Sequence, residues 1–355
     1  MNRTLNKIFI VVFILLCIIP SAGMLVFGQS EAAANEILSP EPAIVNEEGR
    51  FNVSVLSEFS DWFGDRFALR QQLSTLWAQL NAKLFGTSVE DQVILGEDGW
   101  LFFSETLDDF RGVTLSDSEI SAAAENLRII CDYCSERGID FVFTVAPNKN
   151  SLYPGFMPAY IAPGNAVSNA RRLYSELDGL GVNFIDLHEL FESQDVLYFK
   201  TDSHWNSRGA ALAADALLHA LGRESDYSSL DFSSPAEHEG DLYAMLYPAG
   251  NFRETDMQPS EPFGFSCLND PNGGNAINIR TQNDASEGSL MCWRDSFGIS
   301  LYPYLAESFG SARFSRSAKY DLSALDGGEY DAVIIEIVER NIGDLAGLDL
   351  SQFRE

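Results

Sequence analysis

The sequence is poor in basic residues: 23 Lys and Arg stand against 52 Asp and Glu, and the formal net charge is −29. A surface with this charge repels nucleic acid and anionic lipid headgroups, so we expect no nucleic-acid partner. Histidine is scarce as well, with four residues in the chain, which leaves few candidates for a base that works near neutral pH. No internal repeat is visible.

Cysteine is also rare, with five residues. Cys131 and Cys134 are spaced C-x-x-C, but they fall within a predicted helix, and the chain has no second pair like it. A structural zinc site takes about four ligands, so we expect neither a metal site nor a cofactor. Two alternatives remain open for this pair: a disulfide within one helical turn, or two buried thiols.

The chain does contain enough apolar sequence for a large core. Of its 355 residues, 46% are hydrophobic and 12% aromatic, which is not the composition of a disordered protein. This length fits one large α/β domain with additional segments.

The amino-terminal segment is basic and then apolar. Arg3 and Lys7 precede an uncharged run from Ile8 that stays apolar to Phe27, and about 20 such residues are enough to cross a bilayer. Because the positive charges come first, the rest of the chain is expected outside the cytoplasm. We favour an uncleaved membrane anchor over residues 1–28. The alternative is a cleaved export signal, for which there are two small-residue cleavage sites: Ser21–Gly23 and Ala32–Ala34.

Two further regions follow this leader. Residues 29–88 are predicted to be a linker and a juxtamembrane helical segment, since aromatic and leucine side chains recur at helical spacing between Phe51 and Phe85. We expect these apolar side chains to pack in a core. Residues 89–355 are predicted to form one α/β domain, interrupted by a loop-rich insertion or small β lobe at about residues 223–285.

Strands alternate with helices along this domain, after a hairpin at residues 93–103 that turns at Asp98–Gly99. Such alternation predicts a parallel sheet with helices on both faces, whose sites lie beyond the carboxyl ends of the strands. The predicted strands are 139–146, 182–187, 289–293, 312–314 and 330–338. The predicted helices are 116–137, 165–180, 207–221 and 297–309, with a short helical turn at 188–191.

Two short stretches carry candidate chemistry: Thr201–Asn206 and Trp293–Gly298. Ser296 lies between a predicted strand and a predicted helix, where its hydroxyl would be exposed. Its own N–H, with the helix amino terminus, is suited to binding a developing oxyanion. The alternative interpretation is that Asp295 and Ser296 only cap the helix.

His204 is the strongest candidate for the base. Asp202 is two residues away and could hold one ring nitrogen, which leaves the other to accept the serine proton. A surface turn is the simpler interpretation of the Asp-x-His spacing. The other histidines have weaker claims, because His219 lies within a helix face, His188 opens a short helix and His238 lies in the loop-rich insertion.

These stretches also carry a resemblance. Thr201-Asp202-Ser203-His204-Trp205-Asn206, followed about 90 residues later by Asp295-Ser296-Phe297, resembles the exported SGNH-hydrolase-like proteins of the alginate O-acetylation type, the AlgJ/AlgX group, and the bacterial DHHW proteins. The resemblance spans roughly residues 55–345, and Arg294 stands where the Gly-Asp-Ser block of SGNH enzymes has glycine. Other matching stretches are Gly96–Phe102, Val145–Lys149, Tyr153–Pro154 and Ile337–Arg340.

The resemblance implies a flavodoxin-like SGNH fold with the motifs in permuted order, Asp and His before Ser. It implies Ser296 as nucleophile, His204 as base and Asp202 as the orienting carboxylate. Asn148 and Arg340 are weaker candidates for an oxyanion or substrate contact, and a salt bridge is the alternative for Arg340.

We therefore expect an exported, membrane-anchored O-acetyltransferase or acetylesterase that acts on a cell-surface or secreted polysaccharide through an acetyl-serine intermediate. The resemblance also implies a membrane-bound O-acyltransferase as the partner that supplies acetyl groups. The alternative is a catalytically inactive SGNH-like protein that binds carbohydrate or assists assembly in an exopolysaccharide system. For that alternative, Trp100, Trp205 and Trp293 would offer stacking faces for sugars, unless they pack in the core.

Overall fold

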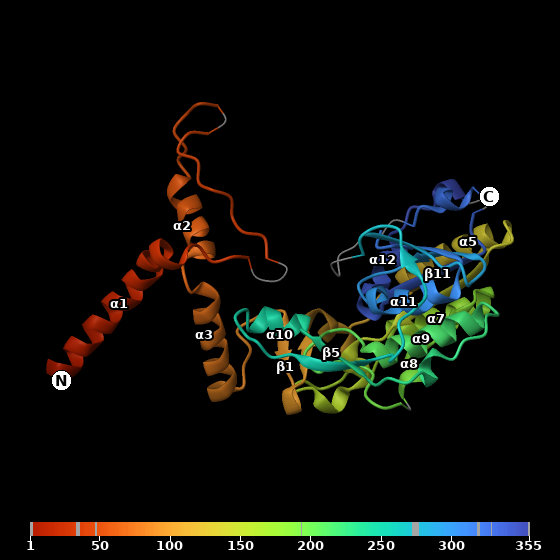
Figure 1. The fold of residues 1–355 in the computed structure, drawn as a ribbon, viewed down its shortest axis with the longest axis horizontal. Helices are drawn as coiled ribbons and strands as arrows, with labels where there is room; N and C mark the ends of the chain where they lie inside the picture. The colour runs from red at the N-terminus through yellow and green to blue at the C-terminus, as the bar shows by residue number, and fades with distance from the viewer. Residues whose placement is uncertain are drawn as a thin grey trace. The chain divides into compact units, whose positions relative to one another are not determined.

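The computed structural model describes residues 3–32, 36–46, 48–192, 194–271, 277–317, 320–327 and 329–353. The chain divides into two compact units (Figure 1). The first contains residues 1–95 and 241–252, and the second contains residues 96–240 and 253–355. The second unit thus begins close to the predicted domain boundary, but a stretch of the predicted insertion is assigned to the first unit.

The first unit begins with helix α1 (Arg3–Phe27), which contains Pro20. Within the described residues, no single helix is long and apolar enough to cross a bilayer. Two segments of α1, Thr4–Leu15 and Ile18–Phe27, meet those criteria together, with a bend of 41° between them. Of the two predicted cleavage sites, Ala33 and Ala34 of the second lie outside the described residues.

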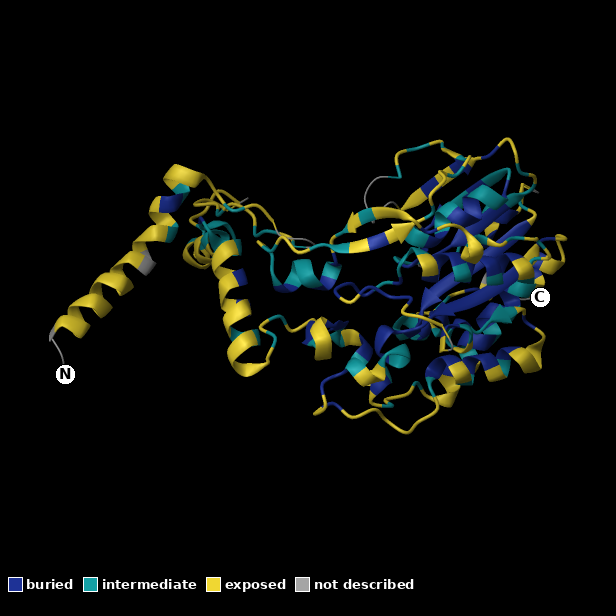
Figure 2. Cartoon of the chain, turned by 60° about the horizontal axis from the view of Figure 1, so that its bottom comes forward, coloured by how far each residue is buried: buried dark blue, intermediate teal, exposed yellow. Residues whose placement is uncertain are grey.

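Helices α2 (Val55–Arg66) and α3 (Arg70–Phe85) form where helical spacing predicts them, but the expectation of core packing is wrong. In α2 no residue is buried, and in α3 only Thr75 and Ala78 are. Trp77 remains 60% exposed, and Figure 2 shows these helices almost wholly in the colours of exposed and intermediate residues. Periodicity identifies an apolar face, but it does not say what covers that face.

A seven-stranded sheet forms the centre of the second unit, in the order β4-β3-β11-β9-β10-β8-β7. The first five strands run parallel, as predicted, whereas β8 and β7 join one edge in antiparallel orientation. Those two strands come from the predicted insertion, so that part of the stretch extends the central sheet. The strands are β3 (Asp140–Ala146), β4 (Phe184–Ile185), β7 (Ser266–Cys267), β8 (Asn278–Gln282), β9 (Ser289–Trp293), β10 (Ser311–Ser315) and β11 (Ala332–Val338).

Helices cover both faces of this sheet, as predicted (Figure 1). Every residue of β11 is buried, as expected for a central strand. The core on one face includes side chains of α8 (Leu187–Glu192), α9 (Ser207–Ala220) and α11 (Gly298–Ser308). The core on the other includes those of α5 (Asp117–Ser135), α7 (Asn169–Leu180) and α12 (Ile342–Ala346).

Local signals set several element ends. Ser116 and Glu119 form a reciprocal capping box at the start of α5, and Asp98 and Gly99 both adopt positive φ between β1 (Val93–Leu95) and β2 (Leu101–Phe103). The cysteine pair is resolved in favour of thiols: Cys131 and Cys134 are both free. Burial raises the pKa of the Cys134 thiol to about 12, so it is an inert core group.

The fold brings three strand ends to one edge of the sheet. Strands β3, β11 and β9 are adjacent and parallel, so the segments after Ala146, Val338 and Trp293 leave the sheet on the same side. A two-stranded antiparallel ribbon, β5 (Ser234–His238) and β6 (Glu254–Gln258), supplies further side chains near this edge. The candidate site lies here.

Candidate active site

Ser296 lies on the sharp turn between β9 and α11. The carboxylate of Asp295 fixes this turn, because one of its oxygens accepts the Phe297 N–H at 2.8 Å and the other accepts the Val338 N–H at 2.7 Å. The turn is therefore tied to the end of the neighbouring strand β11. Asp295 does cap this turn, as the simpler interpretation supposed, but the Ser296 side chain does not.

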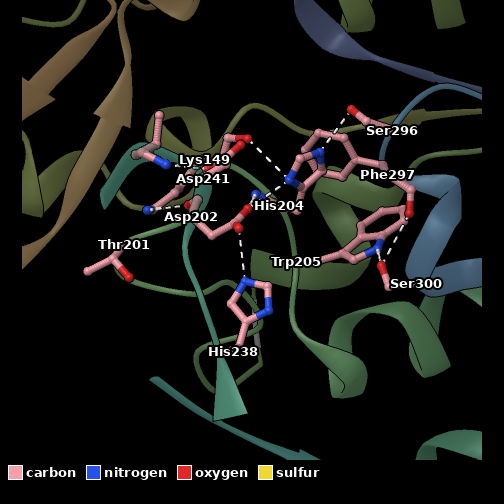
Figure 3. Close-up of polar contacts among 12 residues, drawn as sticks. Lys149, Thr201, Asp202, His204, Trp205, His238, Asp241, Ser296, Phe297 and Ser300 are labelled. Atoms are coloured by element: carbon pink, nitrogen blue, oxygen red, sulfur yellow. Dashed lines mark hydrogen bonds and ion pairs between the residues drawn. The ribbon is translucent and has the colours of Figure 1, made fainter. Parts of the chain in front are cut away.

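The Ser296 hydroxyl instead lies 2.8 Å from Nε2 of His204, and Nδ1 of His204 lies 2.7 Å from Oδ1 of Asp202 (Figure 3). Because a carboxylate only accepts hydrogen bonds, Nδ1 carries the proton, and Nε2 of the neutral ring is free to accept from the serine. The structure thus brings together the three residues that the sequence singles out. The fold thus brings together a histidine and a serine that are 92 positions apart in the chain.

A tight loop holds Asp202 and His204. Residues Tyr198 and Trp205 form an antiparallel bridge across it, and the His204 N–H donates to Oδ1 of Asp202 at 2.8 Å. The indole N–H of the fully buried Trp205 donates to the Ser300 hydroxyl at 2.7 Å. Since Ser300 lies on α11, this bond connects the histidine loop to the helix that follows Ser296.

A second histidine, His238 at the end of β5, donates from Nε2 to the other Asp202 oxygen at 2.8 Å (Figure 3). Its ring stacks on Phe199 with centroids 3.8 Å apart. Burial alone would raise the pKa of the Asp202 carboxyl, but its two imidazole partners hold that pKa well below its usual range. Burial lowers the pKa of His238, yet the hydrogen bond and charge of Asp202 outweigh this effect and raise it.

Two further side chains fix the main chain around Asp202. The buried ammonium of Lys149 donates to the Asp202 carbonyl at 2.8 Å. Glu254, on β6, accepts the N–H groups of Lys200 at 2.9 Å and Thr201 at 2.7 Å. These contacts place the carboxylate before any substrate arrives, which is how a rigid site limits reorganisation during reaction.

Sequence reasoning did not assign a role to His238, Glu254 or Lys149. His238 and Glu254 lie in the part of the chain interpreted as an insertion, where no local pattern links them to Asp202. Lys149 belongs to one of the stretches that carry the resemblance, Val145–Lys149. It lies three residues after the end of β3, and its burial, which the sequence does not reveal, requires polar partners for the ammonium.

The two weaker candidates lie in other contacts. The Asn148 side-chain amide donates to Asp109 at 3.0 Å and its main-chain N–H donates to Glu339 at 2.9 Å, while the Arg340 guanidinium lies 5.1 Å from the Phe103 ring centre. In the described part of the chain, no hydrogen bond joins either residue to Ser296, His204 or Asp202. Their suggested role in the site remains a prediction.

A hydrogen-bonded Ser-His-Asp set lies at the carboxyl edge of a mostly parallel sheet, with Asp and His before Ser in the chain, as the resemblance to SGNH-hydrolase-like proteins implies. Comparison with known proteins supports this resemblance. Residues 93–262 match the family described as "SGNH hydrolase-like domain, acetyltransferase AlgX". The matched range contains Asp202, His204 and His238 but ends before Ser296.

Curated relatives lead to the same group. The chain is 25% identical over 259 residues to a probable alginate O-acetylase AlgJ of Pseudomonas syringae, covering 69% of this chain and 61% of the relative. It is 26% identical over 282 residues to the probable alginate O-acetylase AlgJ of Pseudomonas fluorescens, covering 74% and 65%. The chain thus spans less than two thirds of these relatives. The resemblance inferred from the motifs is confirmed.

Solved structures confirm the fold. Bacillus cereus PatB1 superposes with a TM-score of 0.55 at 19% identity, over 72% of this chain and 99% of that one. A second PatB1 structure, with a sulfonyl adduct, gives a TM-score of 0.56 at 18% identity, over 72% and 98%. At this level of identity the likeness concerns architecture alone.

Proposed function

We propose that this chain is an exported O-acetyltransferase or acetylesterase that acts on a polysaccharide through an acetyl-Ser296 intermediate. The observation that carries the proposal is the continuous set of hydrogen bonds from Ser296 through His204 to Asp202, with heavy-atom distances of 2.8 and 2.7 Å. Distances of this length meet the requirement for an activated serine nucleophile. The names of the relatives support acetyl transfer to a polysaccharide.

In the first half-reaction, Nε2 of His204 takes the hydroxyl proton as Oγ of Ser296 attacks the carbonyl carbon of an acetyl ester. The tetrahedral intermediate collapses as the donor oxygen leaves with the proton held by His204, and acetyl-Ser296 remains. Asp202 stabilises the imidazolium that forms between these two steps. Its two oxygens already have imidazole partners, so it does not need to move during the reaction.

In the second half-reaction, a sugar hydroxyl gives its proton to His204 and attacks the acetyl carbon. Collapse releases the O-acetylated sugar, and the proton returns to Oγ of Ser296. Water in place of the sugar gives acetate, which is the esterase outcome. The balance between the two outcomes depends on which hydroxyl lies next to His204.

The oxyanion of each tetrahedral intermediate needs hydrogen-bond donors. Within the described residues, the Ser296 N–H makes no hydrogen bond, and Ser296 lies two residues before Gly298, the first residue of α11. A main-chain N–H on the nucleophile itself, supported by the positive end of a helix dipole, is a suitable donor. We assign this N–H to the oxyanion site.

The proposed setting is outside the cytoplasm. The basic and apolar leader supports an amino-terminal membrane anchor, and a membrane-bound O-acyltransferase would supply the acetyl group to the domain that the anchor holds nearby. The tryptophans suggested as stacking faces in the inactive, carbohydrate-binding alternative give it little support, because Trp100, Trp205 and Trp293 are each at most 1% exposed.

Labelling of the full chain in detergent with a fluorophosphonate, followed by mass spectrometry of the adduct, tests the proposal. We expect a single adduct on Ser296 that is lost in Ser296→Ala and strongly reduced in His204→Ala. Ser308→Ala is the matched control, because Ser308 is on the same helix and its hydroxyl bonds Tyr227 and Tyr304, which are not part of the Ser-His-Asp set. A folded wild-type chain that gives no adduct on Ser296 would exclude the nucleophile assignment.

A further inference from the structure

A cleft of about 540 Å³ lies beside the Ser-His-Asp set, within the second unit. Its volume is within the ordinary range for sites that bind small molecules. One wall is the histidine loop and His238, a second is the end of β6 with the segment after it, and a third is the first turns of α11. It is lined by Phe199, Asp202, His204, Trp205, Ser207, His238, Asp256, Gln258, Pro259, Phe263, Pro271, Ile299, Ser300, Tyr302, Pro303 and Tyr304.

The cleft combines aromatic walls with a polar floor. Phe263 and Tyr302 are only partly buried, so part of each ring faces the cleft. Phe263 contacts Tyr304 edge to face, with ring centres 5.1 Å apart. On the floor, the Asp256 carboxylate accepts the Ser207 hydroxyl at 2.5 Å and the Ser207 N–H at 3.2 Å. A pyranose ring has apolar faces and a polar rim, and such a surface is complementary to both.

The cleft also has access to the base. His204 lies in its wall, while Nε2 of the same ring bonds Ser296. The acceptor hydroxyl must give its proton to this nitrogen in the second half-reaction, so the acceptor has to lie against His204. A sugar in the cleft meets that requirement.

The charges in the cleft restrict which sugar enters. Its described lining residues include the carboxylates Asp202 and Asp256 but neither lysine nor arginine. The two histidines of the lining, His204 and His238, are each already bonded to Asp202. A sugar carboxylate would therefore meet two acidic groups and no unengaged fixed cation, on a chain whose formal net charge is −29.

We propose that this cleft is the acceptor subsite and that it takes sugar units without a negative charge, neutral hexoses or hexosamines, in preference to uronates. Alginate, named in the relatives, is a polyuronate, so the acceptor here would be of a different class. The claim that a sugar bound here accepts the acetyl group rests on the proposed function. The binding preference itself depends only on the cleft.

The test measures binding without chemistry. The full chain carrying Ser296→Ala, in detergent at physiological salt, is titrated by calorimetry with a neutral chitin hexamer and with a mannuronate hexamer of equal length. We expect the neutral hexamer to bind at least about tenfold more tightly. Phe263→Ala should weaken its binding, since that substitution removes an aromatic wall.

A charge substitution makes the test specific for the cleft. Gln258 is an exposed residue at the end of β6 that lines the cleft, so Gln258→Lys adds a cation there with little risk to folding. This substitution should reduce the ratio of the two hexamers' dissociation constants several-fold. Gln282→Lys, at an exposed position on β8 outside the lining, should leave the difference unchanged.

Tighter or equal binding of the mannuronate hexamer would overturn the inference, and so would failure of the neutral hexamer to bind at millimolar concentration. An equal response to the two lysine substitutions would also overturn it, because the discrimination would then reflect overall charge. Fluorophosphonate labelling separates these failures from failure of the proposed function. Labelled Ser296 without the binding preference rejects the subsite alone, whereas the binding preference without labelling rejects the enzyme and retains the cleft.

Discussion

The ammonium of Lys149 donates a hydrogen bond to the main-chain carbonyl of Asp202 at 2.8 Å. The same group donates to the carbonyls of Leu101 at 2.6 Å and Lys200 at 2.8 Å, and it lies 5.1 Å from the Trp100 ring centre. The side chain is 4% exposed. A buried charge of this kind is tolerated because the carbonyl dipoles and the aromatic ring replace its water. It follows that Lys149 fixes the position of the proposed orienting carboxylate by holding the main chain of Asp202.

Replacing Lys149 tests this support. Lys149→Met keeps an unbranched apolar chain but leaves three carbonyls without their donor, so we expect a loss of roughly 3 kcal/mol in the free energy of unfolding. Urea unfolding followed by tryptophan fluorescence measures the loss. Lys200→Met is the control, because the Lys200 side chain is exposed and should change stability by at most about 0.5 kcal/mol. Similar losses in the two variants would contradict a structural role for the buried ammonium.

Asp202→Asn tests the orienting role in the proposed mechanism. An asparagine side chain can present its N–H to Nδ1 of His204, which then accepts and leaves Nε2 protonated, unable to take the Ser296 proton. We expect the rate of fluorophosphonate labelling at Ser296 to fall by about 10³- to 10⁴-fold, as for an equivalent change in other serine triads.

Asp215→Asn provides the matched control for that substitution. Asp215 is a buried aspartate on α9 that accepts the N–H groups of Tyr227 and Ser228, both at 2.8 Å. Its loss should lower stability by about 1–2 kcal/mol while the labelling rate stays within a few-fold of wild type. A labelling rate for Asp202→Asn that matches this control would argue against the orienting role.

His238 should make the stability of the site depend on pH. Its pKa is raised in the folded chain against the effect of burial, because it bonds Asp202 and lies near Asp256 and Glu254. A raised folded pKa gives stability that is fully present below the unfolded value of about 6.5 and is lost as pH rises through the folded value. Asp202 stays ionised throughout this range, since its pKa is held well below its usual value.

His238→Gln should therefore lower the free energy of unfolding by about 1–3 kcal/mol near pH 6, and by less at pH 8–9. Denaturant unfolding of both proteins across this range gives the difference. His219→Gln is the comparison, because His219 lies on an exposed position of α9 and bonds the Ser225 carbonyl at 2.8 Å. A difference for His238→Gln that does not change with pH would show that the positive charge of the imidazolium does not contribute to stability.

Local sequence patterns predicted much of the fold. The continuous apolar run of β11 and the capping residues around α5 each contain their own signal, and both elements formed close to the expected bounds. Ser296, His204 and Asp202 were found because each motif is short and continuous. Their assembly follows from parallel strands, whose carboxyl ends meet at one edge of the sheet.

Contacts between distant segments were not predicted. The bond from His238 to Asp202 joins residues 36 positions apart, and it depends on where the chain after α9 places the end of β5. The exposure of Trp77 could not be predicted for a related reason. The pattern of α3 indicates an apolar face, but among the described residues of its own unit nothing buries that face as the sheet core buries the helices of the second unit. Tertiary context alone decides both features.

A second acidic residue supports the turn that carries Ser296. Glu336, in the middle of β11, is 1% exposed and accepts the Asp295 N–H at 3.2 Å through Oε2. Burial, and then the charge of Asp295, raise the pKa of Glu336 well above its usual range. The folded chain therefore keeps a proton on this carboxyl at pH values where the unfolded chain has lost it.

The stability of Glu336→Gln relative to wild type should consequently increase as pH rises. Because the folded state binds more protons than the unfolded state above the unfolded pKa of about 4.3, wild-type stability falls with rising pH until the folded pKa is reached. Glutamine has nearly the same shape and no proton to lose, so its stability relative to wild type should increase from pH 5 to pH 8 by about 1 kcal/mol or more. Glu287→Gln, at an exposed position before β9, should show no such trend. If Glu336→Gln were instead increasingly destabilised at pH 8, Glu336 would have to be ionised in the folded chain and paired with a cation, and the turn at Ser296 would be held by charge attraction and not by a neutral carboxyl.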